Sequence, residues 1–210
     1  MGTEILKLRP EDEEEVIGFV IEGMNFTRYT KSAWLADLLF GRYFFYAALA
    51  ECTQPIAAYT AEGKLAGILL ISFRGEPQLR IPWWKRAYVK CVRVLRHLYF
   101  RGTDRHYDEA NARLLAAYGK PVDGEICLMA VNPRLQKQGI GSALLQELER
   151  RGRGRHVCVY TDDDCAYTFY EHHDFRCVGW EPIEMRSGSA KFPLVCMLYA
   201  RQLPETEKAQ

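Results

Sequence analysis

The sequence lacks any long uninterrupted run of apolar residues. Its longest apolar stretches, Tyr43 to Ala50 and Leu65 to Phe73, have about half the length that a membrane-spanning helix needs. The segment from Met1 to Pro10 also lacks the charged start, apolar stretch and small-residue cleavage site of a signal peptide. We therefore expect a soluble cytoplasmic protein with no membrane span.

The sequence also lacks a large net charge and closely spaced pairs of cysteines. The formal net charge is only +1 at pH 7, so the chain as a whole has no strong attraction to nucleic acid or to acidic partners. The seven cysteines are odd in number and widely scattered, with no CxxC pair, which argues against a disulfide framework. His172 and His173 are adjacent on an expected helix and point in different directions, so we expect no metal site.

The residues that are present fit one globular domain. A chain of 210 residues with 48% hydrophobic and 26% charged residues is long enough to bury a core without disulfides or metals. No internal repeat and no Pro/Ser-rich linker divides it. We expect a single domain over residues 1–200 and a polar tail at 201–210.

Hydrophobic periodicity predicts a mixed α/β chain. Strands are expected at 4–9, 55–60, 64–73, 125–131, 156–161, 175–180 and 194–200. Helices are expected from Pro10 onward and at 33–39, 80–120 (in two stretches), 139–151 and 165–172.

The first of the two stretches at 80–120 is locally cationic. Residues 80–105 contain eight Lys or Arg and one acid. One helical face carries Trp84, Ala87, Tyr88, Cys91, Leu95 and Leu98, and much of the rest carries Lys85, Arg86, Lys90, Arg93 and Arg96. A surface helix that buries its apolar face on the domain is the main interpretation. Two others stay open: a cover that favours an acidic acceptor, and reversible docking on an anionic membrane or nucleic acid.

The sharpest local signal is a glycine-bearing loop between a strand and a helix, in residues 131–142. Leu144, Leu145 and Leu148 then give the helix an inward apolar face. A helix start presents unpaired backbone NH groups and the positive end of the helix dipole, and glycines let a phosphate approach closely. The spacing matches neither a P-loop nor the dinucleotide fingerprint. The loop is suited to a pyrophosphate.

This loop resembles the acetyl-CoA loop of the GNAT superfamily of N-acetyltransferases, whose pattern is filled by Gln136, Gly139 and Gly141. Further residues stand at the family's downstream spacings: Asp163, Ala166, Phe169, Tyr170, Glu171 and Phe175. Asp163 and Asp174 depart from the usual Asn and Gly. The resemblance covers about residues 125 to 180.

The resemblance implies a mostly antiparallel sheet of six or seven strands with a splayed parallel pair, helices on both faces and a helical insertion at about 80–120. It implies acetyl-CoA as co-substrate, an amine acceptor and no metal, and dimers are common in the family. The implied cofactor-binding residues are Met129, Ala130, Val131, Gln136, Lys137, Gln138, Gly139, Ile140, Gly141, Ser142 and Asp163. The acceptor groove would involve residues 25–29, 44–46 and a loop at 182–192.

Acetyl transfer to an amine needs two proton transfers. By resemblance, Glu125 is the candidate base and Tyr170 the candidate donor to the departing CoA sulfur, with direct attack in a ternary complex. Glu125 as a solvated carboxylate, Tyr170 as a core aromatic, and Cys127 or Cys165 as a covalent acetyl carrier stay open. So do the acceptor, a small amine or a protein, and the alternative of a non-catalytic acyl-CoA sensor or scaffold.

Overall fold

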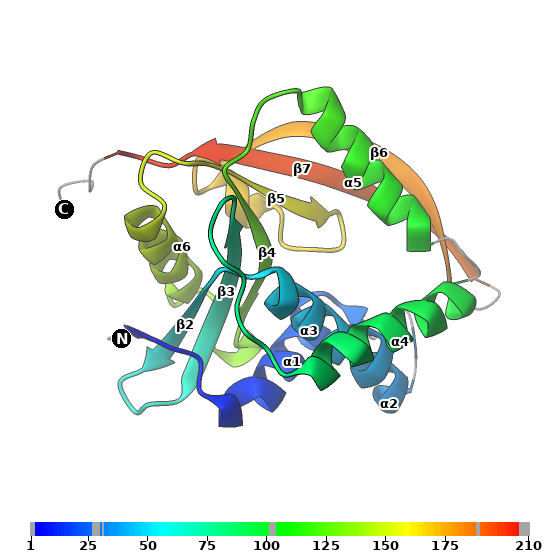
Figure 1. The fold of residues 1–210 in the computed structure, drawn as a ribbon, viewed down its shortest axis with the longest axis horizontal. Coiled ribbons are helices and arrows are strands. Elements are labelled where there is room, and N and C mark those ends of the chain that lie inside the picture. Colours follow the sequence, from blue (N-terminus) through cyan, green and yellow to red (C-terminus); the bar gives the residue numbers. More distant parts are fainter. Residues whose placement is uncertain (1–2, 27–29, 31, 101–103, 188–189, 206–210) are drawn as a thin grey trace.

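The computed structural model describes residues 3–26, 30, 32–100, 104–187 and 190–205. A seven-stranded sheet in the order β1-β2-β3-β4-β5-β7-β6 forms its centre (Figure 1). The strands are β1 (Thr3–Leu6), β2 (Gln54–Thr60), β3 (Leu65–Phe73), β4 (Gly124–Val131), β5 (His156–Asp162), β6 (Arg176–Ser187) and β7 (Ala190–Gln202). Every neighbouring pair is antiparallel except β4 and β5, which confirms the predicted fold class.

Helices cover both faces of this sheet. The helical elements are η1 (Pro10–Asp12), α1 (Glu13–Gly23), α2 (Ala33–Ala36), the π-helical η3 (Asp37–Gly41), α3 (Arg42–Glu51), α4 (Trp83–Tyr99), α5 (Asp104–Tyr118), η4 (Pro133–Leu135), α6 (Ile140–Arg151) and α7 (Thr168–Glu171). The α4 and α5 helices lie between β3 and β4 in the chain, as the predicted helical insertion requires.

Side-chain alternation assigns each helix to a face. On one face, α1, α3 and α4 pack over β2, β3 and β4, and α5 covers Cys158 and Leu198 of β5 and β7. On the other face, α6 packs over the same central strands, together with Val157, Val159 and Tyr199. Both faces of β3 are therefore covered, which explains its nearly unbroken apolar sequence.

A glycine in β3 brings α6 close to the sheet. A Cβ at Gly67 would lie 3.1 Å from the backbone oxygen of Ala130, 3.1 Å from Ile140 and 3.2 Å from Leu144. An added side chain would push these neighbours away, so Gly67 lets the first turn of α6 lie close against the ends of β3 and β4.

Several predicted elements differ from those of the structure. Residues 42–51, given no element from sequence, form α3. The predicted loop at 182–192 lies largely in β6 and β7, whose long antiparallel pairing runs from Arg176↔Ala200 to Ser187↔Ala190. The predicted polar tail begins too early, because Arg201 and Gln202 belong to β7 and Leu203 is buried. Residues 206–210 lie outside the described residues.

The predicted orientation of α4 is also wrong. Its buried residues are Lys85, Val89, Val92 and Arg96, whereas Leu95 and Leu98 of the expected inward face are exposed. Periodicity predicted the helix and its two faces correctly. The face that packs on the domain is the other one, because the two buried cations have specific partners there. Within the described part of the chain, no helix is both long and apolar enough to cross a membrane.

Candidate active site

The parallel pair β4 and β5 opens into a wedge. The two strands pair only at Gly124↔Val157 and Glu125↔Cys158, although β4 continues to Val131 and β5 to Asp162. Beyond Glu125, the edge of β4 that faces β5 has no described strand partner. Backbone groups on such an edge need other hydrogen-bond partners, so this stretch can bind an extended ligand.

A bulge in β4 adjoins the wedge. Leu128 pairs with Leu70 and Ile126 pairs with Ile71, so Cys127 is the extra residue between them. Bulges bend a strand and redirect its side chains, and they are frequent beside active sites. Here the bulge separates the paired start of β4 from the segment Met129 to Val131 that borders the wedge.

The loop after β4 leads into an uncapped helix start. Asn132 closes its first turn, with its Oδ1 accepting a hydrogen bond from the Arg134 NH at 3.0 Å. Lys137 and Gly139 both adopt left-handed backbone conformations, with φ of 63° and 79°, and no side chain caps α6 at Gly139. Backbone NH groups in such a turn, together with the helix dipole, favour an anion. Residues Gln136 to Gly139 are exposed, so a ligand can reach them.

The two motif glycines serve different purposes. A Cβ at Gly139 would meet nothing within 4 Å, so this glycine is required by its left-handed backbone and leaves open space at the helix start. A Cβ at Gly141 would lie 2.9 Å from the Phe169 ring and 3.3 Å from the Met129 side chain. Gly141 therefore allows α6, β4 and the α7 segment to meet.

Tyr170 lies in the aromatic cluster that this contact creates. Its ring centroid is 5.6 Å from those of Phe169 and Phe175 and 6.3 Å from that of Tyr199. Burial raises the pKa of Tyr170 above its ordinary value, so its hydroxyl stays protonated at neutral pH. Its side chain packs against the same core cluster as α6. A protonated phenol in this position is available as a proton donor.

Glu125 stands at the opposite face of the sheet. Its neighbour Ile126 points into the core beneath α6, so alternation directs Glu125 to the side of α3 and α5. The residue is solvent-accessible, yet the protein around it desolvates the carboxyl enough to raise its pKa, and the carboxylate of Glu51 raises it further. Such a group is a stronger base than an ordinary surface glutamate.

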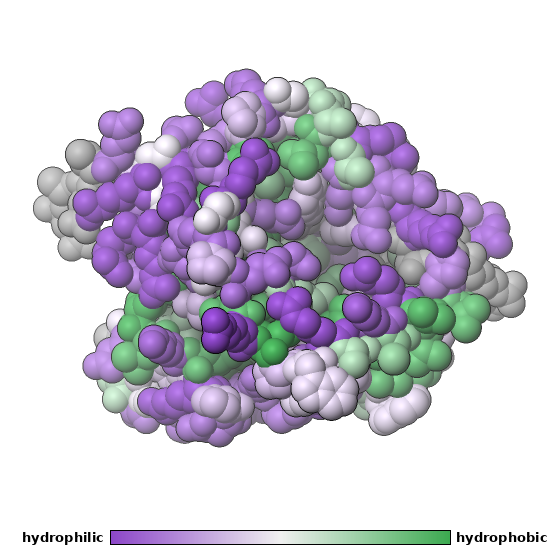
Figure 2. Space-filling view, viewed as in Figure 1, coloured by the Kyte–Doolittle hydropathy of each residue, from purple (hydrophilic) through white to green (hydrophobic). Residues whose placement is uncertain are grey.

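The structure thus places the two candidate catalytic residues on either side of the wedge. Tyr170 and the helix start of α6 lie on one face, and Glu125 lies on the other. Figure 2 shows that the surface is hollowed between the part over α5 and the part over α4.

Some residues predicted to contact ligands also make contacts within the fold. The carboxylate of Asp163 accepts a hydrogen bond from the Val195 NH at 2.8 Å, so it is engaged in holding β7. Of the segments expected to form the acceptor groove, 182–192 is largely strand and Phe45 and Tyr46 are buried core residues. Residues 27–29 of the third segment lie outside the described part of the chain.

His173 and Glu51 join the site, although sequence reasoning did not assign them to it. Nε2 of His173 lies 3.1 Å from Oγ of the predicted cofactor-binding residue Ser142, and burial is the main cause that lowers the pKa of this histidine. Glu51, at the end of the unpredicted α3, influences Glu125. Only the pairing of distant segments brings these groups together, so no local pattern could have indicated them.

The described residues favour neither a covalent acetyl-cysteine nor a metal site. Burial raises the pKa of Cys127 and of Cys165 above the ordinary thiol value, so both remain thiols and are poor nucleophiles at neutral pH. Among the described residues, no group of three or more His, Cys, Asp or Glu side chains could hold a metal ion.

A large surface depression lies away from these groups. It has a volume of about 740 Å³ and is bordered by Tyr118, His156, Arg176 and Gln202, among others. It lies at the closed, paired end of β5, and neither Glu125, Tyr170 nor the loop at 136–142 borders it. The wedge, not this depression, combines the anion-binding turn with candidate acid and base groups.

Comparison with known proteins identifies related sequences. Residues 104–177 match the family model described as an acetyltransferase (GNAT) domain. The peptidyl-lysine N-acetyltransferase YiaC of Escherichia coli (strain K12) is 25% identical over 104 residues, which are 50% of this chain and 68% of that protein.

Solved structures extend the likeness over nearly the whole chain. An N-acetyltransferase from Staphylococcus aureus Mu50 has a TM-score of 0.53 at 15% identity, covering 97% of this chain and 99% of its own. A GCN5-related N-acetyltransferase from Rhodopseudomonas palustris has a TM-score of 0.54 at 13% identity, covering 97% of each chain. At these identities the likeness concerns the fold.

Proposed function

The chain belongs to the GNAT superfamily of N-acetyltransferases, and we propose that it transfers an acetyl group from acetyl-CoA directly to a primary amine within a ternary complex. The observation that carries the proposal is the wedge between β4 and β5, which lies beside the uncapped start of α6. An open strand edge and an anion-binding turn are the two surfaces that a pantetheine arm and its pyrophosphate require.

The residues present fit this co-substrate. The backbone of Gln136 to Gly139 and the first NH groups of α6 would hold the pyrophosphate, because no side chain caps them and Gly139 leaves open space. The edge of Met129, Ala130 and Val131 would pair with the pantetheine amides. When bound, acetyl-CoA supplies an activated acetyl thioester at the wedge.

Glu125 and Tyr170 supply the two proton transfers. Glu125 accepts a proton from the incoming ammonium group, directly or through a water molecule, which leaves a neutral amine nucleophile. A backbone NH of Met129 or Ala130 polarises the acetyl carbonyl. As the new C–N bond forms and the C–S bond breaks, Tyr170 donates its hydroxyl proton to the sulfur, while the proton lost by the amide nitrogen passes to solvent.

The charges near the wedge favour an amine that arrives as a cation. Glu125 and Glu51 lie close enough for one carboxylate to raise the pKa of the other, and a protonated amine between them would relieve this repulsion. The similarity to a peptidyl-lysine N-acetyltransferase points in the same direction. We therefore take a lysine side chain in a peptide as the first acceptor to test.

The test is acceptor-dependent release of CoA by wild type and Tyr170→Phe, with lysine peptides and small primary amines as acceptors. Loss of the donor should reduce kcat about 100-fold while acetyl-CoA affinity changes little. Tyr118→Phe is the matched control, because the Tyr118 hydroxyl contacts His156 and Tyr118 does not belong to the aromatic cluster around Tyr170.

Two results would oppose the proposal. CoA release that never depends on an added amine would favour a non-catalytic acyl-CoA-binding protein. If Tyr170→Phe kept full activity, the protein would still be an acetyltransferase, but Tyr170 would not be the proton donor.

A further inference from the structure

The α4 helix buries two charged side chains and exposes a stripe of apolar ones. Lys85 and Arg96 are buried beside Val89 and Val92. The opposite side of the helix carries exposed apolar residues at helical spacing, which we call the outer stripe: Trp84, Cys91, Val94, Leu95 and Leu98. This is the reverse of a surface helix that packs on its own domain.

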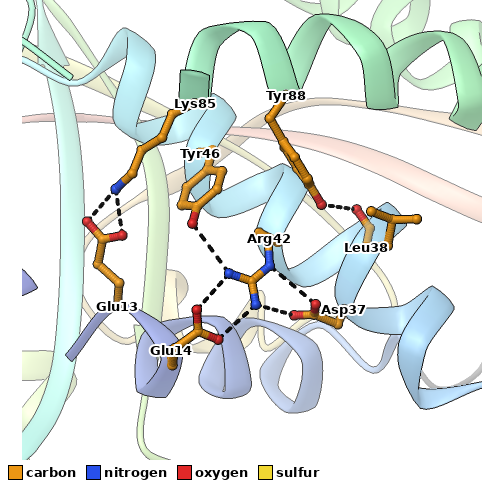
Figure 3. Close-up of polar contacts among 8 residues, drawn as sticks. All are labelled: Glu13, Glu14, Asp37, Leu38, Arg42, Tyr46, Lys85 and Tyr88. Atoms are coloured by element: carbon orange, nitrogen blue, oxygen red, sulfur yellow. Dashed lines mark hydrogen bonds and ion pairs between the residues drawn. The ribbon is translucent and has the colours of Figure 1, made fainter. Parts of the chain in front are cut away.

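Specific contacts fix this orientation at the first half of the helix. The Lys85 ammonium group binds both carboxylate oxygens of Glu13 at 2.5 Å, and the Tyr88 hydroxyl donates to the Leu38 backbone oxygen at 2.7 Å. Figure 3 shows Lys85 and Tyr88 reaching from α4 to α1 and η3. Rotating the helix to bury the outer stripe would break these contacts.

Arg96 fixes the second half in the same way. Its guanidinium group donates to the backbone oxygen of Leu39 at 2.6 Å and lies over four aromatic rings, those of Phe40, Tyr43, Phe44 and Phe100. Removing a buried cation from such partners is strongly unfavourable. The outer stripe is therefore a fixed feature of the surface.

The outer stripe is well exposed along the length of α4. The exposed fractions are 46% for Trp84, 61% for Val94, 48% for Leu95 and 68% for Leu98, and the adjacent Trp83 is 79% exposed. In Figure 2, hydrophobic side chains gather over the C-terminal half of α4, next to strongly hydrophilic ones. A contiguous apolar patch of this kind marks an interaction surface.

Cations run beside the outer stripe on the same helix. Arg86 and Lys90 are exposed and lie four residues apart, so they line one side of the stripe, whereas the Arg93 side chain bonds to Tyr43 of the same domain. Residues 80–100 contain no Asp or Glu. Exposed tryptophans and leucines flanked by Lys and Arg are the composition of a helix that lies in the plane of an anionic lipid surface.

We propose that α4 binds the surface of an anionic bilayer, with the outer stripe in the acyl-headgroup boundary and Arg86 and Lys90 at the headgroups. A second copy of the chain fits this surface less well. A symmetric dimer would place the same cationic patch of each subunit against the other, and like charges would repel.

The test is co-sedimentation of the protein with vesicles of phosphatidylcholine alone and of phosphatidylcholine with about 30% phosphatidylserine. We expect binding only to the anionic vesicles, weakening as salt is added. Leu95→Gln/Leu98→Gln should reduce partitioning at least about tenfold, and Arg86→Gln/Lys90→Gln should reduce it about 25-fold, a factor of roughly five per charge.

Matched control variants distinguish binding through α4 from nonspecific adsorption to vesicles. Leu115→Gln changes an exposed leucine of α5, and Lys7→Gln with Lys64→Gln in the β2–β3 turn removes two exposed cations elsewhere. The Leu115→Gln variant and the Lys7→Gln/Lys64→Gln variant should bind vesicles like wild type. The circular dichroism spectrum and acetyl-CoA affinity report folding, and the charge variant remains a test if the leucine variant unfolds.

Three results would overturn the proposal. One is absence of wild-type binding to the anionic vesicles, and another is unchanged binding of both α4 variants. The third is a wild-type protein that is a dimer and does not bind vesicles, and whose Leu95→Gln/Leu98→Gln variant is a monomer. This result would assign the outer stripe to a second copy of the chain.

Discussion

Glu125 combines two properties that oppose each other. Water reaches its carboxylate, yet the surrounding protein and the charge of Glu51 make ionisation harder than in a free glutamate. A general base needs both access and a raised pKa, because a stronger base removes a proton more readily. The same features make the residue unfavourable for folding at neutral pH.

We expect Glu125→Gln to lower kcat/KM about 100-fold or more. In wild type, kcat/KM should fall as the pH drops through the raised pKa of Glu125, which lies above the ordinary value of 4.5. The glutamine variant should lack this acidic limb. Initial rates from pH 5 to 8 would measure this pH dependence, with Glu4→Gln as an exposed control. An acidic limb that is unchanged in Glu125→Gln would show that another group is responsible for it.

The same substitution should stabilise the fold at neutral pH. Because the folded-state pKa is raised, the stability contributed by Glu125 is fully present below the unfolded-state pKa and is lost as the pH rises through the folded-state pKa. Glu125→Gln should therefore raise Tm at pH 7, and this gain should vanish below about pH 4.5. A variant less stable than wild type at pH 7 would show that Glu125 has a structural role.

At the scale of elements, the start of α6 depends on two glycines for different reasons. Gly139 has a left-handed backbone and open space, whereas Gly141 contacts Phe169 and Met129. Gly139→Ala should strain the backbone by about 1–2 kcal/mol and weaken acetyl-CoA binding by changing the anion-binding turn. Gly141→Ala should destabilise the fold by about 1–3 kcal/mol through overpacking.

Calorimetric titration and thermal melting of the two variants would measure both effects. Gly63→Ala is the matched control for strain, since Gly63 has a φ of 75° and nothing within 4 Å of an added Cβ, but it lies in the β2–β3 turn. If Gly63→Ala weakened acetyl-CoA binding as much as Gly139→Ala, the turn at 136–139 would not be the anion site.

The α4 helix shows how an element can be located correctly and oriented wrongly from sequence. Its period indicated a helix over residues within 80–120 and separated apolar from cationic residues. Burial then followed Glu13, the Leu39 carbonyl oxygen and the rings of α3 and η3. A cation with a dedicated partner can occupy the inward face, and a hydrophobic pattern does not contain that information.

At the scale of the whole molecule, binding of acetyl-CoA should be visible as stability. A ligand that binds only the folded state at 100 times its Kd adds about 2.7 kcal/mol to the free energy of unfolding. For a chain of this size, that amounts to a rise in Tm of roughly 5–11 °C. Differential scanning fluorimetry would measure it.

ATP is the informative control for this experiment. It offers phosphates to the turn before α6 but has no pantetheine arm for the open edge of β4, so its effect on Tm should be much smaller. Equal shifts with ATP and acetyl-CoA would mean that the wedge contributes nothing to binding.

The sequence by itself determined the fold class, the helical insertion, the strand, loop and helix from β4 to α6, and the family. These depend on local periodicity and on contiguous motifs such as Gln136, Gly139 and Gly141. Only the tertiary structure decided that the charge of Glu51 acts on Glu125, that Asp163 is engaged by Val195 and that α4 presents its apolar stripe to solvent. Each of these depends on a partner distant in the chain, and a side chain's environment is set by the segments folded against it rather than by its sequence neighbours.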